Sequence, residues 1–409
     1  MSNPIPLLIL SDSPMGSSGL GRICRELAVR IHANLPEFRV GVIGYGGSVS
    51  RHLGFQQYPM VVRDFMPLNL PDVWKDFAGD ERGICLCIWN QSWLPWMGNP
   101  ERCVDESLKK FLLTNPFERW LYTPIDGDTI DGRLPQNLGK CMAGFDRLLA
   151  YTKYGADVCD LTFRRPLGTT EHLPHGIDCS IWYPRDRKVA RDTFTNRVAG
   201  LKMNPLKDDI FLVGILGTNS ARKNWFLGLE VCRELVARGV NLGLWLHPDS
   251  LRKNWDLPQL IEEFGLTDKT IASNRILSDD DLAFGYSACD ATLGIAREGF
   301  GYALAESLAC GTPVITGRYA AATDYVPSQF MVEPIGYHGE GFFGVRDASY
   351  RASDWADVVM AAKREDAILP TYLQWDVAFD GWAKWLRAGL ADLNANPADQ
   401  VTATFGVKP

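Results

Sequence analysis

The chain has 409 residues, of which 46% are hydrophobic and 22% are charged, and its formal net charge is -7. This length exceeds what one compact core needs and predicts two domains of ordinary size. The acidic balance excludes a global attraction to nucleic acid or anionic membranes, so binding to either would need a local basic patch.

The ten cysteines are mostly far apart, and their one close pair, Cys85 and Cys87, fits no CxxC zinc or redox site. That pair lies in an apolar run, where a reduced thiol behaves as a small buried hydrophobic group. No stretch reaches the roughly 18 apolar residues that span a bilayer, and the N-terminus lacks a basic leader. The sequence therefore predicts a soluble, cytoplasmic protein without a transmembrane segment.

Short apolar runs alternate with segments of helical period along both halves of the chain. The predicted strands are residues 6–10, 40–43, 84–88, 120–123, 147–151, 210–216, 242–246, 270–277, 291–295 and 313–316. Helices are predicted at residues 225–238 and, after a Ser278 cap, at 279–287. This alternation is typical of βαβ units, so we expect an α/β fold with two doubly wound parallel sheets.

The predicted domains are residues 1–184 and 210–371. Between them, residues 185–209 are charged and lack a strand pattern, which predicts an interdomain linker. Residues 373–393 have the period of an amphipathic helix with Trp375, Trp382 and Trp385 on one side. We expect residues 372–409 to form this helix and a tail that packs on the N-terminal domain.

The strongest local signal lies between Glu298 and Ile315, where Glu298 and Glu306 flank a glycine-rich turn. A helix that begins near Gly301 would direct its free N–H groups and positive dipole end toward an anion or a polar sugar edge. Glu298 can accept hydrogen bonds from sugar hydroxyls, and Glu306 is spaced for the hydroxyls of a ribose. A plain strand–loop–helix explains one glutamate but not two acids combined with three glycines.

These residues resemble the E-x7-E region of retaining family-4 glycosyltransferases, also called glycosyl transferases group 1, which have the GT-B fold. The resemblance implies that Glu298 and the amides of the next four residues hold the transferred sugar. These four are Gly299, Phe300, Gly301 and Tyr302. It also implies that Glu306 holds the nucleotide ribose. The implied architecture is two Rossmann-like domains that face each other across a cleft, with a C-terminal helix that crosses back to the first domain.

The loop at residues 214–224 follows a predicted strand and opens a helix. Arg222 and Lys223 can neutralise a diphosphate there, since arginine offers a planar fork and lysine a mobile point charge. The family usually has arginine after the second glycine, where this chain has Thr218, and Lys223 matches the family's lysine. Thr218 is itself a donor-binding candidate, and three further residues are candidates by position, namely Asn219, His247 and Leu277.

A first glycine-rich loop follows the strand at residues 6–10 and contains Gly16, Gly19 and Gly21. Glycines let the backbone approach a ligand at the start of the next helix. The pattern lacks the acidic residue of the dinucleotide-binding fingerprint. It resembles the family's first loop, which faces the donor phosphates and the acceptor.

Candidate acceptor-side residues follow the predicted strands of the first half. Asp126 stands where many relatives carry a histidine near the reacting centre; it can accept a proton from the acceptor, although Asp-Gly is also a routine turn pair. The tryptophan-rich loop at residues 89–96 suits stacking on a sugar ring or simply caps the core. It supplies Asn90 and Trp93 as acceptor candidates, together with Asp128.

The expected reaction is retaining transfer of a hexosyl group from a UDP- or GDP-sugar to a hydroxyl. No cofactor is expected; the nucleotide sugar is the co-substrate, and no metal site is expected because Arg222 and Lys223 supply cations. Two alternatives stay open. One is a sugar-nucleotide 2-epimerase of the same fold, and the other is a non-catalytic relative that binds the nucleotide sugar, as the departures at Thr218 and Asp126 suggest.

The sequence leaves the acceptor and the oligomeric state open. Glycans and lipid-linked glycans are preferred as acceptors over hydroxylated bases in DNA. Basic residues such as Arg164 and Arg165 would suit a phosphate backbone, but scattered surface charge explains them as well.

Overall fold

The structure is a computed structural model that describes residues 3–198, 208–341 and 344–395. The chain divides into two compact units, one of residues 1–175 and 378–409 and the other of residues 176–377. The first unit thus ends at His175, before the predicted boundary at residue 184. The reason lies in contacts within the second unit, where the Ile177 amide donates to the Leu373 carbonyl (2.7 Å) and the Trp182 ring lies 5.8 Å from Tyr286.

The first unit is built on a seven-stranded parallel sheet with the order β3-β2-β1-β6-β7-β8-β9. Its strands are β1 (Ile5–Asp12), β2 (Phe38–Tyr45), β3 (Gln56–Pro59), β6 (Gly83–Ile88), β7 (Phe117–Thr123), β8 (Arg147–Ala150) and β9 (Glu171–His172). Both faces of a parallel sheet are covered, and accordingly the run Leu7 to Leu10 in β1 is fully buried. A small antiparallel ribbon, β4 (Val62–Arg63) and β5 (Met66–Pro67), was not predicted.

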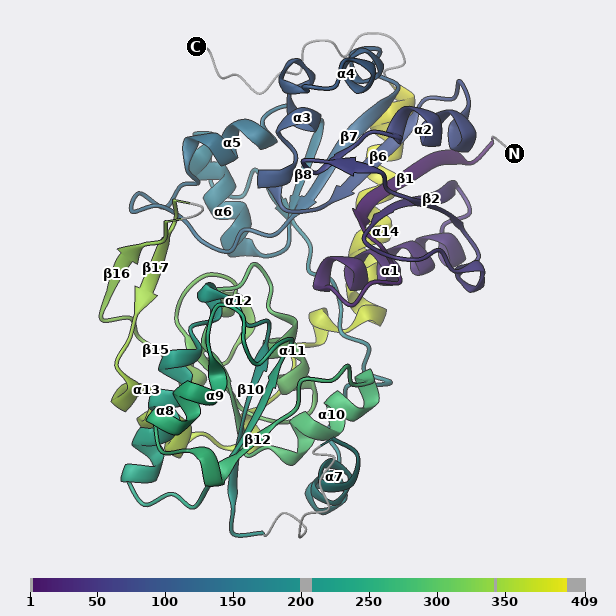
Figure 1. The fold of residues 1–409 in the computed structure, drawn as a ribbon. Helices are drawn as coiled ribbons and strands as arrows, with labels where there is room; N and C mark the ends of the chain where they lie inside the picture. Colours follow the sequence, from purple (N-terminus) through teal and green to yellow (C-terminus); the bar gives the residue numbers. More distant parts are fainter. Residues whose placement is uncertain (1–2, 199–207, 342–343, 396–409) are drawn as a thin grey trace. The chain divides into compact units, whose positions relative to one another are not determined.

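Helices cover the first sheet (Figure 1). They are α1 (Gly19–Asn34), α2 (Leu70–Ala78), α3 (Pro95–Gly98), α4 (Glu106–Leu113), α5 (Gln136–Met142), α6 (Lys153–Thr162) and α14 (Trp375–Ala395), of which the last belongs to this unit from Ala378 onward. The Trp385 ring lies 4.9 Å from Trp120, and Trp382 donates to the Pro174 carbonyl (3.1 Å). The tryptophan side of α14 thus packs on the sheet, and the expected tail after residue 395 lies outside the described residues.

The second unit contains a six-stranded parallel sheet with the order β12-β11-β10-β13-β14-β15. Its strands are β10 (Phe211–Gly217), β11 (Leu242–Pro248), β12 (Thr270–Ala272), β13 (Ala291–Gly294), β14 (Val314–Gly317) and β15 (Met331–Val332). An antiparallel hairpin, β16 (Gly336–Gly339) and β17 (Arg346–Ser349), follows the sheet. The predicted strand at 270–277 is observed only over β12, and Leu277 packs into a core cluster with Trp245.

The helices of the second unit are α7 (Arg187–Thr193), α8 (Trp225–Ala237), α9 (Leu257–Glu263), α10 (Asp279–Ala288), α11 (Tyr302–Ala309), α12 (Ala322–Tyr325) and α13 (Ala352–Ala361). Two of them have side-chain caps, of which only the one at Ser278 was predicted. Ser278 accepts from the Asp281 amide (3.1 Å) at the start of α10, and Asn224 accepts from Leu227 (3.4 Å) in α8.

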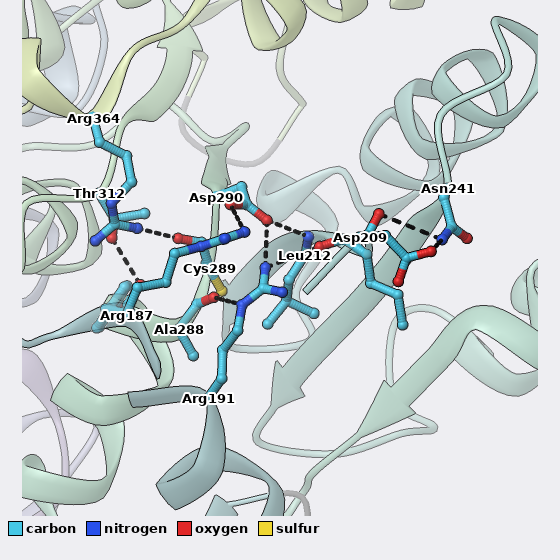
Figure 2. Close-up of polar contacts among 12 residues, drawn as sticks. Arg187, Arg191, Asp209, Leu212, Asn241, Ala288, Cys289, Asp290, Thr312 and Arg364 are labelled. Carbon is cyan, nitrogen blue, oxygen red and sulfur yellow. Dashed lines mark hydrogen bonds and ion pairs between the residues drawn. The ribbon is translucent and has the colours of Figure 1, made fainter. Parts of the chain in front are cut away.

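The predicted linker at residues 185–209 is wrong over residues 187–198, which form α7 and a following helical turn inside the second unit. Figure 2 shows Arg187 and Arg191 converging on Asp290 at the start of β13, where Arg191 lies 2.7 Å from the carboxylate. Asp290 also accepts from the Leu212 amide (2.8 Å). Arg191 is therefore a buried ion-pair partner, whereas Lys188 and Arg197 stay exposed. Residues 199–207 lie outside the described part of the chain.

Candidate functional site

Lys223 and Glu298 lie at the carboxyl edge of the second sheet, in the loops that follow β10 and β13. The strand order places β10 and β13 side by side, with β11 and β12 on the far side of β10 and β14 and β15 on the far side of β13. At such a switch point, the two loops diverge and leave a crevice in which open α/β sheets bind ligands. We call Arg222, Lys223 and Glu298 the switch-point cluster.

The three side chains of the switch-point cluster contact one another. The Lys223 ammonium donates to Glu298 Oε1, and Arg222 Nη1 lies 3.3 Å from Glu298 Oε2. Gly217, at the end of β10, has φ +149, and a side chain there would come within 3.3 Å of the Lys223 stem. Glycine at this position therefore leaves room for the Lys223 side chain to pass the end of β10 and reach Glu298.

Glu298 remains ionised at neutral pH. Burial raises the pKa of its carboxyl, but the charges of Arg222 and Lys223 and their hydrogen bonds outweigh burial and lower the pKa to about 2. Two cations and one carboxylate leave the cluster with a net positive charge. The charge of the cluster thus favours an anion.

Backbone hydrogen bonds fix the turn that presents Glu298. The Ala321 amide donates to the Glu298 carbonyl (3.1 Å), and the buried Tyr325 hydroxyl donates to the carbonyls of Phe300 and Gly301. Gly301 has φ +87, a left-handed conformation that favours glycine, and it caps α11. Tyr302 is the first residue of α11, whose N-terminal amides therefore begin directly after the turn.

Arg297 holds the turn that presents Glu298 through contacts of its buried side chain. Its side chain is 1% exposed and lies 2.7 Å from Asp347 and 3.6 Å from Glu340 of the β16–β17 hairpin. Its carbonyl accepts a hydrogen bond from Arg222. The hairpin is thus linked through one buried arginine to the residue next to Glu298.

Glu306 lies one turn into α11 and is 6% exposed. The Tyr286 hydroxyl of α10 donates to its Oε2 at 3.0 Å. A carboxylate has about four acceptor positions, and this hydroxyl occupies one of them.

The four remaining donor candidates of this unit fall into two groups. Thr218 is exposed beside the cluster, and His247, at the end of β11, is hydrogen-bonded to Ser273 (2.8 Å), with its pKa lowered by burial. Asn219 and Leu277 have structural contacts instead. The Asn219 side chain is buried, and its Nδ2 donates to the carbonyls of Ser250 and Trp255, whereas Leu277 lies in the core cluster.

The first unit has its own switch point, between β1 and β6. Asp12 ends β1 and accepts hydrogen bonds from the Trp89 indole (2.8 Å) and the Ser18 hydroxyl. Gly21, one of the predicted loop glycines, lies where a side chain would collide with the Ser13 carbonyl at 2.5 Å. The loop is thus tightly folded around Ser13, with Gly16 also close to it and Gly19 exposed at the start of α1.

The acceptor candidates lie in the segments that follow β6 and β7, and they do not form one cluster. The Asn90 carboxamide oxygen accepts from the Ser92 amide (2.9 Å), so this oxygen is occupied in capping a turn. Trp93 is partly exposed and stacks on Phe65 with a centroid distance of 4.8 Å and an interplanar angle of 5°. Asp126 is half-buried and Asp128 is buried in the loop after β7.

Among the residues that the structure describes, no group of three or more histidine, cysteine, aspartate or glutamate side chains could hold a metal ion. Within the same residues, no helix combines the length and the hydropathy that crossing a bilayer requires.

Residues 203–339, which include the whole switch-point cluster, match the model of the family described as glycosyl transferases group 1. This segment is similar to that family, and we refer to it as the group 1 domain. A D-inositol 3-phosphate glycosyltransferase of Paenarthrobacter aurescens is 23% identical over 223 residues, which are 53% of this chain and 48% of that protein. The chain thus spans about half the length of this curated relative.

Solved structures share the fold over nearly the whole chain. HepE of Anabaena in complex with UDP has a TM-score of 0.66 at 11% identity and covers 94% of this chain and 100% of its own. Sucrose-phosphate synthase of Thermosynechococcus elongatus has a TM-score of 0.66 at 15% identity and covers 95% and 100%. At these identities the likeness shows the fold, and the predicted α/β class with the GT-B fold is confirmed.

Four residues around these sites were not predicted, namely Asp12, Tyr286, Arg297 and Tyr325. Asp12 ends a parallel strand, so the rule that such ends carry functional side chains would have found it. Arg297 directly precedes Glu298. Tyr286 contacts Glu306 in α11, and Tyr325 contacts the turn at Gly301. Only the fold brings these residues together.

Proposed function

We propose that the chain is a retaining hexosyltransferase that moves a sugar from a nucleoside-diphosphate sugar to an acceptor hydroxyl. The observation that carries this proposal is the switch-point cluster, where Lys223 and Arg222 meet Glu298 inside the group 1 domain. Few other functions need two cations, an ionised carboxylate and a helix N-terminus in one crevice.

The cations are assigned to the donor diphosphate. Breaking the bond between the anomeric carbon and the diphosphate oxygen leaves negative charge on the departing group. Lys223 and Arg222 would stabilise that charge, and pre-positioned charges of this kind are often the largest single contribution to catalysis. Because the chain supplies these cations itself, the proposed transfer needs no divalent metal.

Glu298 and Glu306 are assigned to two sets of hydroxyls. Ionised Glu298 and the amides after it, from Gly299 to Tyr302, would hold the transferred sugar. Glu306, oriented by Tyr286, would accept from the ribose hydroxyls. Thr218 and His247 are proposed to line the rest of the donor site, since both follow strands at the same edge.

The first unit is assigned to the acceptor. Asp126 is proposed to accept the proton of the attacking hydroxyl, and the loop with Gly16, Gly19 and Gly21 is proposed to approach the donor phosphates. Trp93 offers a partly exposed ring, and Asn90 and Asp128 offer polar groups for an acceptor sugar. Glycans and lipid-linked glycans fit this combination best, and a hydroxylated DNA base ranks below them.

UDP-sugars are the first donors to test, with GDP-sugars second. HepE of Anabaena, which shares the fold, has been solved with UDP-glucose. The D-inositol 3-phosphate glycosyltransferase is named for a transfer to a hydroxylated acceptor. These relatives support the choice of donor and leave the acceptor to experiment.

The test starts with thermal unfolding of the wild-type chain in UDP-, GDP-, ADP- and TDP-sugars, because a bound donor raises the unfolding midpoint by mass action. The best donor is then incubated with acceptor pools, and products are identified by mass spectrometry. We expect Glu298→Ala and Lys223→Ala to abolish transfer while their circular dichroism matches that of the wild type.

The same assay separates the alternatives. Wild-type turnover in either variant would reject the assignment of the cluster. An epimerised nucleotide sugar formed without any acceptor would indicate the 2-epimerase, and donor binding without turnover would indicate a non-catalytic relative.

A further inference from the structure

A cavity lies in the first unit, and none of the residues that line it was assigned above to the donor or the acceptor. It has a volume of about 1260 Å³ and lies among α3, α5 and α6, which Figure 1 shows together at one side of the first sheet. Its charged lining consists of Arg102, Arg133, Lys140 and Arg164, without a carboxylate among the described residues that line it. We call this cavity the basic groove.

The four cations of the basic groove lack the partners that their neighbours have. Arg119 donates to backbone carbonyls, and Lys153 pairs with Asp157. In contrast, none of the four forms an ion pair or a side-chain hydrogen bond with any described residue. Four like charges in one hollow repel one another and focus a positive potential there, in a chain whose net charge is -7.

Three glycines build the floor of the groove. A side chain at Gly98 would meet the Cys141 carbonyl at 2.0 Å, one at Gly144 would meet the Gly98 carbonyl at 1.6 Å, and one at Gly139 would meet Thr162 at 2.9 Å. The backbones of α3 and α5 therefore touch, and α5 packs closely on α6. Close contacts between helices therefore hold this side of the groove in place.

Arg164 occupies a position that favours glycine. It follows α6 with φ +56, and the amides of Arg164 and Arg165 donate to the carbonyls of Leu161 and Asp160, which closes a Schellman motif. Glycine would fit this left-handed site without strain. An arginine that is strained, exposed and unpaired at the rim of a basic groove is accounted for if its guanidinium binds an anion.

We propose that the basic groove binds a soluble small molecule that carries two or more phosphate groups. Three of its four cations are arginines, whose planar fork matches phosphate oxygens. Its volume exceeds the roughly 300–1,000 Å³ of ordinary small-ligand pockets, which leaves room for several charged groups. The cations lie in a hollow, which a flat bilayer cannot follow, and a duplex would need a far larger surface than this groove.

The probe is inorganic tripolyphosphate, titrated calorimetrically into the full-length Arg222→Met/Lys223→Met variant so that the proposed donor site contributes nothing. We expect saturable binding of one tripolyphosphate per chain. Adding Arg164→Gly should weaken the affinity about tenfold or more, whereas Arg164→Lys should retain most of it. The ligand-free unfolding midpoint of Arg164→Gly should equal or exceed that of its parent, because the strain is relieved.

Lys363→Gln, which removes one exposed charge in the second unit, is the matched control and should leave the affinity unchanged. The proposal is overturned if tripolyphosphate does not bind, or if Arg164→Gly and Lys363→Gln weaken binding equally. It is also overturned if only phosphatidylglycerol vesicles or single-stranded oligodeoxythymidylate bind at the groove. Each of these outcomes leaves the sugar-transfer proposal untouched, since that proposal is tested by donor binding and turnover in proteins whose basic groove is intact.

Discussion

Lys223 and Glu298 are 75 residues apart in the sequence, yet the lysine ammonium donates directly to the glutamate carboxylate. Without a ligand, each neutralises the other within the crevice. A nucleoside-diphosphate sugar would have to replace this contact, its diphosphate taking the lysine and its sugar hydroxyls the carboxylate. Binding of the two parts of the donor is therefore coupled through one ion pair.

This coupling predicts different effects of Glu298→Gln on binding and on transfer. Without the carboxylate, Lys223 and Arg222 keep their full charge for a diphosphate, so UDP should bind as tightly as in the wild type or more tightly. Transfer should fall about 10²–10³-fold, the usual loss when one pre-positioned polar group is removed. Calorimetry with UDP and a transfer assay check the two parts, with the exposed Glu262→Gln as the control. A parallel loss of UDP affinity would contradict the coupling.

Stability should depend on the ionisation of Glu298. Its pKa is lowered from 4.5 to about 2 in the folded chain, so its ionised form stabilises the fold above pH 4.5 and this contribution is lost as the pH falls toward 2. The difference in unfolding free energy between wild type and Glu298→Gln should therefore shrink over that range. Urea unfolding at several pH values measures it. A difference that is the same at both ends of the range would show that the ion pairs do not set this pKa.

The ion pair between Arg191 and Asp290 should contribute strongly to stability. Arg191 is 2% exposed, and Asp290→Ala would remove the carboxylate that lies 2.7 Å from its guanidinium. We expect a loss of about 3–5 kcal/mol in unfolding free energy. Asp268→Ala removes an exposed partner of Lys269 and should cost less than about 1 kcal/mol. Denaturant unfolding compares the two, and equal losses would mean that α7 is not held by this pair.

Gly301→Ala should affect both stability and donor binding. The left-handed backbone costs an alanine about 1–2 kcal/mol, and the new methyl would lie 3.2 Å from the Glu298 side chain. Gly239→Ala is a matched control, because Gly239 has φ +85 and no atom within 4 Å of the added carbon. Gly301→Ala should lose at least as much stability as Gly239→Ala, and only Gly301→Ala should weaken UDP-sugar binding. If the two variants bound UDP-sugars equally well, the turn at Gly301 would not belong to the donor site.

The parts of the chain that could be predicted are those set by local sequence. The apolar runs at β1, β6, β10 and β13 locate the strands within a few residues, because strands buried on both faces have continuous apolar sequences. The turn at Gly301 and the start of α11 follow from glycine and helix-capping rules. The E-x7-E spacing then identified the glycosyl transferases group 1 segment.

The parts that could not be predicted depend on contacts between distant residues. The charges of Arg187 and Arg191 indicated a solvated linker. Their common partner Asp290 lies 103 residues after Arg187 and 99 residues after Arg191, so local sequence could not reveal it. Asn219 and Leu277 stood at strand ends, but whether their side chains face the crevice or the core depends on Ser250, Trp255 and Trp245. The pairing of the β16–β17 hairpin with Arg297 has no local signal.

The most direct test of the central claim is calorimetric titration of UDP into the wild type, Lys223→Met and Lys363→Met. If the switch-point cluster holds the donor diphosphate, UDP should bind the wild type and Lys363→Met alike and bind Lys223→Met at least about tenfold more weakly. Equal UDP affinity in all three proteins would contradict the account.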